Sequence, residues 1–69
     1  MTKRMFGELV RAAREEKGLS LRALADQAGL DYSRLARIEQ GTRPSPDLAT
    51  TRSLAEALDL DLATLLVSA

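Results

Sequence analysis

Side chains that donate hydrogen bonds are concentrated between residues 31 and 43. This segment holds Tyr32, Ser33 and three arginines, Arg34, Arg37 and Arg43. A guanidinium group can bond two acceptors at once, such as O6 and N7 of guanine, and it can also hold a phosphate. The segment therefore offers the chemistry of recognising an acceptor-rich surface.

Catalysis is not expected. The 69 residues include no histidine and no cysteine. The sequence has no Gly-rich phosphate loop and no paired carboxylates in an evident pocket, and we interpret its scattered acids as helix caps or solvated faces. We therefore expect a protein that is not an enzyme, with no catalytic residue, cofactor, metal site or small-molecule ligand.

The composition favours a single all-α domain over residues 1–69. Ala, Leu, Arg and Glu, which are strong helix formers, dominate, and β-branched residues are scarce. No apolar run approaches the roughly 20 residues that cross a bilayer, and the N-terminus lacks a signal-peptide pattern. We expect a cytoplasmic protein with no membrane partner.

Charge is distributed unevenly along the chain. The formal net charge is zero, which counts against nucleic acid because domains that bind it are usually basic. However, residues 1–45 hold nine Lys or Arg against six Asp or Glu, and residues 46–69 hold one Arg against four acids. The zero total therefore conceals a basic end and an acidic end.

Capping residues divide the first part of the chain into three helices. The first runs from about Arg4 to Lys17 and ends at Gly18. Ser20 caps a second helix, which Gly29 ends, and Asp31 caps a third helix, residues 31–40, which ends at Gly41.

Two more helices are predicted in the acidic part. Ser45-Pro46-Asp47 is a strong helix start, with Ser45 as the cap and the proline in the first turn. The inward stripe of this fourth helix is Leu48, Thr51, Leu54, Ala55 and Leu58. Asp61 caps a short fifth helix that carries Leu62, Leu65 and Leu66.

The tight connection between the second and third helices requires a steep crossing. Ala25 must be small where the two helices cross, and Gly29 must supply a positive φ in a crowded turn. Leu35 and Ile38 must fill the corner between the helices. The offsets of Ala25, Gly29 and Leu35 resemble the helix-turn-helix signature.

The resemblance extends along nearly the whole chain without large insertions. The matching segments are Gly18-Leu19-Ser20, Leu24-Ala25, Gly29-Leu30, Ile38-Glu39-Gln40-Gly41, Pro46 and Leu54-Ala55-Glu56-Ala57-Leu58. Together they resemble the phage repressor and Cro-like (XRE-type) family of bacterial and phage transcriptional regulators. The resemblance implies a compact five-helix, lambda-repressor-like domain. It also implies sequence-specific binding of double-stranded DNA, as a repressor, with residues 31–40 in the major groove.

The helical angle assigns sides to the third helix. At about 100° per residue, Leu35 and Ile38 point inward, and Arg34 lies to one side. The outward residues are Ser33, Ala36, Arg37 and Gln40.

Specific roles follow for these outward positions. Arg37 is the best candidate base reader, and its alternative is a solvated arginine or a phosphate contact. The resemblance places Tyr32 and Ser33 at base-contacting positions, although Tyr32 could equally cover the turn. We expect phosphate contacts from Ser20, Arg34, Gln40, Thr42 and Arg43.

A structural ion pair is expected beside this helix. Glu39 falls at about 40° from Leu35, on the inward flank, where an unpaired carboxylate is costly. Arg14 matches the family position that pairs with this glutamate. We expect a bridge that holds the third helix against the first.

Some positions depart from the family pattern. Leu21 stands where many relatives have a phosphate-binding glutamine, and Asp31 adds charge close to the DNA backbone. Asp59 occupies a turn where glycine is common. The first two departures favour an alternative function, a protein-interaction module or antitoxin-like component on the same scaffold.

The end of the chain suggests self-association. Residues 62–69 carry no charged side chain, although the outer face of a terminal helix in a small soluble monomer normally does. Leu62 and Leu65 suffice as anchors, which leaves Ala63, Leu66 and Val67 for a homodimer contact. Such a dimer would bind a palindromic operator. The alternative is a helix that once led into a further domain.

Overall fold

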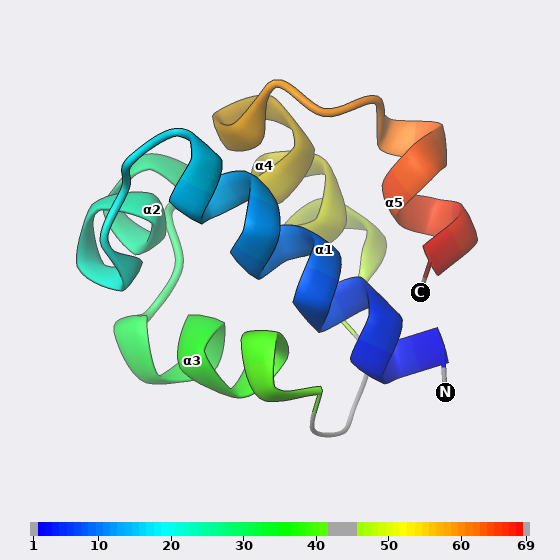
Figure 1. The fold of residues 1–69 in the computed structure, drawn as a ribbon, viewed down its shortest axis with the longest axis horizontal. Helices are drawn as coiled ribbons and strands as arrows, with labels where there is room; N and C mark the ends of the chain where they lie inside the picture. The colour runs from blue at the N-terminus through cyan, green and yellow to red at the C-terminus, as the bar shows by residue number, and fades with distance from the viewer. Residues whose placement is uncertain (1, 42–45, 69) are drawn as a thin grey trace.

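The computed structural model describes residues 2–41 and 46–68, which form helices and no strands (Figure 1). The helices are α1 (Thr2–Glu16), α2 (Leu21–Ala28), α3 (Tyr32–Gln40), α4 (Leu48–Leu58) and α5 (Leu62–Ser68). The predicted all-α class and the order of five helices are confirmed. α1 begins two residues earlier than predicted, within the usual uncertainty of a helix end.

The predicted caps of α2 are confirmed. The Ser20 hydroxyl accepts a hydrogen bond from the backbone N–H of Ala23 at 3.0 Å. At the other end, Gly29 has φ 69° and donates its own N–H to the carbonyls of Ala25 and Asp26. Each end of this short helix therefore has partners for some of its otherwise unpaired backbone groups.

The start of α4 differs from the prediction. The N-cap is Asp47, whose carboxylate accepts from the backbone N–H of Thr50 at 2.9 Å. Pro46 therefore precedes the helix instead of lying in its first turn, and Ser45 lies outside the described residues. The predicted cap was misplaced because Asp47 is as good a capping residue as serine and stands closer to the apolar stripe.

The core lies between all five helices. Its buried hydrophobic side chains are Phe6, Val10, Leu24, Ala25, Ala28, Leu35, Ile38, Leu54, Ala55, Leu58 and Leu65. Thr51 is also buried, and its hydroxyl donates to the carbonyl of Asp47 at 2.9 Å, which satisfies it. The prediction was wrong for Leu48, which is 53% exposed because it is the first residue of α4, at the edge of the core.

A close backbone approach joins α1 to α3. A Cβ added to Gly7 would lie 2.7 Å from the carbonyl oxygen of Glu39 and closer still to that of Ile38. Backbone carbonyls at a helix crossing cannot move aside like a side chain. Only glycine therefore allows this separation of α1 and α3.

The turn after α4 carries a strained residue. Asp59 is the non-glycine residue with a positive φ, 57°, among the described residues. Its carboxylate forms an exposed ion pair with Lys17, whose Nζ donates to Oδ2 at 3.0 Å. The sequence analysis noted that glycine is common at this position. The structure gives the reason, because the backbone of Asp59 adopts the left-handed conformation that glycine prefers.

The arrangement leaves one side of α3 uncovered. α1 packs against α3, α4 and α5, and α3 contacts α1 and α2 (Figure 1). None of the described helices is long and apolar enough to span a membrane.

Candidate nucleic-acid interface

The turn between α2 and α3 sets the direction of α3. Gly29 is left-handed, with φ 69° and ψ 32°, and the N–H of Leu30 returns to the carbonyl of Ala25 at 2.8 Å. The predicted positive φ is present. The predicted crowding is wrong, since nothing lies within 4 Å of a Cβ built on Gly29. The need for glycine here comes from the backbone angle alone.

α3 has a buried side and an exposed side. Leu35 and Ile38 are buried, and Ala25 of α2 lies buried beside them in the core. The exposed residues are Tyr32, Ser33, Arg34, Arg37 and Gln40, and Ala36 is half-buried. The structure therefore gathers on one helix most of the side chains that the sequence singled out. Thr42 and Arg43 lie outside the described residues.

The N-terminus of α3 is capped differently from the expectation. The backbone of Asp31 takes the N-cap conformation, but its side chain makes no capping hydrogen bond to the helix. Instead, the carboxylate accepts from the Ser33 hydroxyl at 2.8 Å. This hydrogen bond is the largest cause that lowers the pKa of Asp31 below its ordinary value, which further favours the ionised carboxylate. The Ser33 oxygen is left to act as an acceptor.

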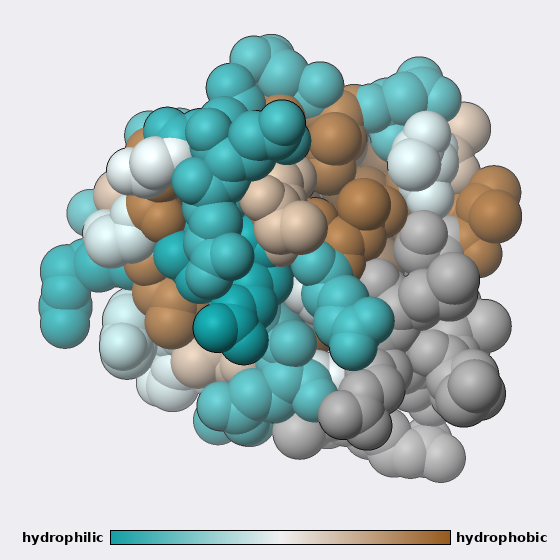
Figure 2. All heavy atoms as spheres, viewed as in Figure 1, coloured by the Kyte–Doolittle hydropathy of each residue, from teal (hydrophilic) through white to brown (hydrophobic). Residues whose placement is uncertain are grey.

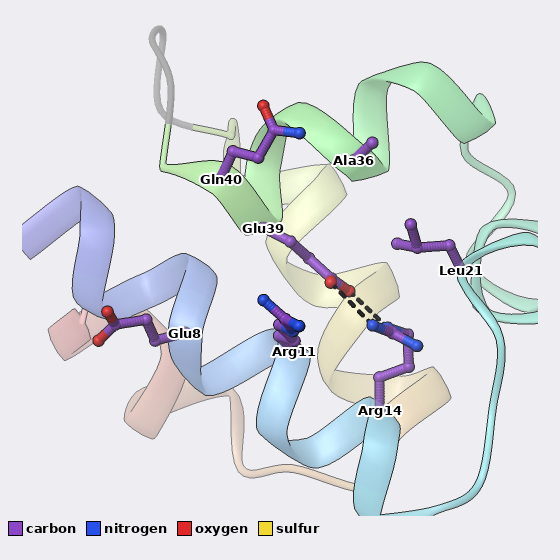
Figure 3. Close-up of a pocket in the computed structure, with 7 residues that line it drawn as sticks. All are labelled: Glu8, Arg11, Arg14, Leu21, Ala36, Glu39 and Gln40. Atoms are coloured by element: carbon purple, nitrogen blue, oxygen red, sulfur yellow. Dashed lines mark hydrogen bonds and ion pairs between the residues drawn. The ribbon is translucent and has the colours of Figure 1, made fainter.

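The Arg14–Glu39 bridge is present and nearly buried (Figure 3). Arg14 Nε donates to Glu39 Oε2 at 2.8 Å and Nη2 donates to Oε1 at 3.2 Å, a bidentate geometry. The two side chains are 12% and 6% exposed. Arg14 Nη1 also donates to the carbonyl of Leu19 at 2.8 Å. One guanidinium thus ties α3, α1 and the turn before α2 together, and its bond to Glu39 raises the pKa of Arg14.

A cleft of about 380 Å³ runs beside this bridge. Figure 3 shows its residues on three elements: α1 (Glu8, Arg11 and Arg14), the start of α2 (Leu21) and α3 (Ala36, Glu39 and Gln40). Ala36 is the small residue of this wall. A bulkier side chain would fill the cleft next to the exposed face of α3.

Two of the predicted phosphate-binding side chains have neighbours within the domain. The Ser20 oxygen accepts the capping bond from Ala23 N–H, which leaves its O–H free to donate to a phosphate. Arg34 lies close enough to Asp47 that its charge helps to lower the pKa of that carboxyl, after the hydrogen bonds from Thr50.

The structure also shows a contact that the sequence reasoning missed. The Arg22 guanidinium carbon lies 4.9 Å from the centre of the Tyr32 ring. The two residues are ten apart in sequence and become neighbours only through the turn. For Gly7, also missed, a signal was available, because a glycine inside a helical pattern indicates close packing.

The C-terminal helix has one anchored side and one exposed side. Leu65 is fully buried, whereas Leu66 is 47% and Val67 83% exposed. Ala63 is exposed as well. Figure 2 shows hydrophobic atoms on the side of the molecule where Figure 1 places α5. The residues expected at a dimer contact are therefore accessible.

This geometry is that of a helix-turn-helix domain, and comparison with known proteins agrees. A family model described as "Helix-turn-helix domain" matches residues 5–66, and the chain belongs to this family. The HTH-type transcriptional repressor RghR of Bacillus subtilis is 46% identical over 55 residues, covering 80% of this chain and 41% of the relative. The XRE-type resemblance inferred from sequence is thereby confirmed. The chain spans about half the length of the curated relatives that it matches.

Solved structures share the fold. The restriction-modification controller protein C.AhdI from Aeromonas hydrophila superposes with a TM-score of 0.83 at 39% identity, over 90% of this chain and 92% of that one. SinR, a regulator found in Bacillus subtilis and described as the master regulator for biofilm formation, was solved in complex with DNA. It superposes with a TM-score of 0.84 at 35% identity, over 90% of this chain and 98% of that one.

Proposed function

We propose that this domain binds double-stranded DNA in a sequence-specific manner and regulates transcription as a repressor. The observation that carries this proposal is the two-sided α3, with Leu35 and Ile38 buried and a row of hydrogen-bonding side chains exposed. In a helix-turn-helix, such a second helix lies in the major groove. The DNA complex of SinR and the repressor name of RghR support the same function.

The side chains divide into two roles. Arg37, Tyr32 and Ser33 face the bases, with Arg37 suited to guanine and the Ser33 oxygen suited to a base amino group because its proton is held by Asp31. The phosphate contacts come from the flanks of this face, at Ser20, Arg34, Gln40, Thr42 and Arg43.

A homodimer on a palindromic operator completes the proposal. One domain of this size covers only a few base pairs. The exposed apolar side of α5, at Ala63, Leu66 and Val67, supplies a surface on which two copies can pair. Pairing about a two-fold axis would place two α3 helices about 34 Å apart on one side of the duplex.

A second function is favoured by the net charge of zero and by the ionised Asp31 at the start of α3. On this reading the scaffold binds another protein, as an interaction module or an antitoxin-like component.

Selection of bound sequences from a random duplex pool, followed by titration at several salt concentrations, separates these functions. DNA recognition predicts an enriched site with two-fold symmetry and affinity that falls steeply as salt rises, because bound phosphates release counterions. An unenriched pool with no salt-dependent binding would overturn the DNA proposal and leave the protein-interaction function.

A further inference from the structure

The contact between Arg22 and Tyr32 joins the two helices of the motif at their N-terminal ends. Arg22 is the second residue of α2 and Tyr32 the first of α3. The guanidinium lies over the ring at 4.9 Å, within the range of a cation–π interaction. Both side chains are exposed, so this contact lies at the surface beside the exposed side of α3.

The hollow around this contact has one cation that the protein itself leaves available. Residues Arg14, Ser20, Leu21, Arg22 and Tyr32 line a depression of about 470 Å³. Arg14 is hydrogen-bonded to Glu39 and to the Leu19 carbonyl, whereas the Ser20 oxygen accepts its capping bond and keeps its O–H as a donor beside Arg22. Among the side chains that the structure describes, those of residues 6–41 and 46–67, Arg22 has the ring of Tyr32 as its one partner.

The contact with the Tyr32 ring and the absence of an anionic partner among the described side chains allow Arg22 to hold the ring and to bind an anion at the same time. A guanidinium that rests on a ring directs its N–H donors outward in its own plane, so it can bind an oxyanion without leaving the ring. Tyr32 is 44% exposed at the first turn of α3, where a ring with no neighbour would change rotamer freely. Arg22 limits that freedom.

We propose that Arg22 is a positioning residue that binds a backbone phosphate of DNA and thereby fixes the Tyr32 ring for recognition in the groove. This inference rests on the proposed function. In the helix-turn-helix arrangement the first helix crosses the DNA backbone, so α2 brings Arg22 to a phosphate as α3 enters the groove. The phosphate contact and the sequence preference at one base pair are thereby coupled through a single ring contact.

The test compares Arg22→Ala, Arg22→Lys and Tyr32→Leu with the double variant, on a selected duplex and on duplexes changed one base pair at a time. Arg22→Ala should weaken binding roughly tenfold and reduce the salt slope by about one. It should also flatten the preference at the base pair that Tyr32→Leu flattens. Arg22→Lys should keep the salt slope and lose much of that preference, because an ammonium has no planar fork. The matched control, Arg11→Ala, removes an exposed arginine of α1 and should leave every base preference unchanged.

A measurement without DNA tests the contact itself. In nuclear magnetic resonance spectra, the side-chain protons of Arg22 should be shifted by the Tyr32 ring current, and Tyr32→Leu should abolish the shift. The sequence has no tryptophan, and its other aromatic residue, Phe6, is buried in the core and unchanged in Tyr32→Leu, so the difference between the two spectra reports the Tyr32 ring. Equal Arg22 shifts in the wild type and Tyr32→Leu would overturn the inference.

The DNA-binding measurements distinguish a failure of this inference from a failure of the proposed function on which it rests. Strictly additive losses in the double variant, with normal binding by the wild type, would overturn the coupling alone. A wild type that bound no duplex would overturn both. A loss in the double variant smaller than the sum of the two single losses, with the shared base preference, is the supporting result.

Discussion

At the scale of single residues, the exposed side of α3 combines side chains with different hydrogen-bonding capacities. Arg37 supplies donors that match guanine, and the Asp31–Ser33 pair supplies acceptors. If this side of α3 contacts the bases, each side chain should control the sequence preference at its own base pair.

Arg37→Ala tests this prediction most directly. Losing a bidentate contact should cost about 1–3 kcal/mol at one base pair and relax the preference there. Binding to single-substituted duplexes measures both effects, with Arg11→Ala as a control for loss of one positive charge. Equal weakening on matched and mismatched sites would remove Arg37 from base recognition.

The Arg14–Glu39 bridge acts on stability instead. Because the two side chains are only 12% and 6% exposed, removing one leaves the other without its partner in a poorly solvated place. Arg14→Met or Glu39→Gln should each lower the free energy of unfolding by about 1.5–3 kcal/mol. The double variant should lose less than the sum, as urea denaturation would show. Additive losses would mean that the two groups act independently.

At the scale of the helix, two glycines are required for different reasons. Gly7 is fixed by the carbonyls of α3 that surround it, and Gly29 by its left-handed backbone in open space. Replacing each glycine with alanine therefore measures two different losses of stability. The loss at Gly7 comes from a steric clash, and the loss at Gly29 comes from an unfavourable backbone angle.

Gly7→Ala should be the more damaging substitution. A methyl group forced against the Glu39 carbonyl must push α1 and α3 apart, which typically costs 1–3 kcal/mol and more where backbone cannot yield. Gly29→Ala should cost about 1–2 kcal/mol for the positive φ. Thermal unfolding of both variants gives the comparison. A Gly7→Ala protein as stable as the wild type would contradict the close crossing.

The cap of α4 makes the stability of that helix depend on pH. The hydrogen bonds from Thr50 lower the pKa of Asp47 below its ordinary value. A carboxyl with a lowered folded pKa stabilises the fold above its unfolded pKa, about 3.9, and that contribution is lost as pH falls through the folded pKa. The melting temperature of the wild type should therefore fall towards that of Asp47→Asn below about pH 4. Asparagine caps well but does not ionise. A constant gap between the two proteins from pH 7 to pH 3 would exclude this role.

At the scale of the whole molecule, the basic and acidic parts of the sequence are folded into one small body. α3 exposes Arg34 and Arg37 on the proposed DNA face, and α5 exposes the apolar side chains of Leu66 and Val67. Recognition and self-association can therefore use different surfaces of the same domain.

Val67→Glu tests the proposed dimer. Val67 is 83% exposed, so the change should leave the fold intact, but a charge buried in a two-fold contact meets its own copy. Sedimentation should shift towards the monomer and operator affinity should fall, with unchanged helix content. Gln27→Glu, which adds the same charge on an exposed position of α2, should leave sedimentation unchanged. A wild type that is monomeric both free and on DNA would contradict the dimer.

Local signals in the sequence determined the helices and the two sides of α3. Ser20 and Gly29 bound α2 because capping and left-handed geometry are properties of a few consecutive residues. The 3.6-residue period assigned Leu35 and Ile38 to the core and the polar side chains to the surface for the same local reason.

Only the tertiary structure decided which distant groups meet. The partner of Arg22 and the exposure of Leu48 depend on how the helices pack, which no local pattern contains. A glycine inside a helical pattern indicates close packing at Gly7, but only the structure identified the α3 carbonyls as its neighbours. The choice of Asp47 over Ser45 as the cap of α4 was likewise open in the sequence, because both residues cap well. The Arg14–Glu39 pair came from family resemblance, and the structure supplied its bidentate geometry. Helix ends and the inward side of a helix are set by residues close together in sequence. Contacts across the core depend instead on the packing of all the helices together.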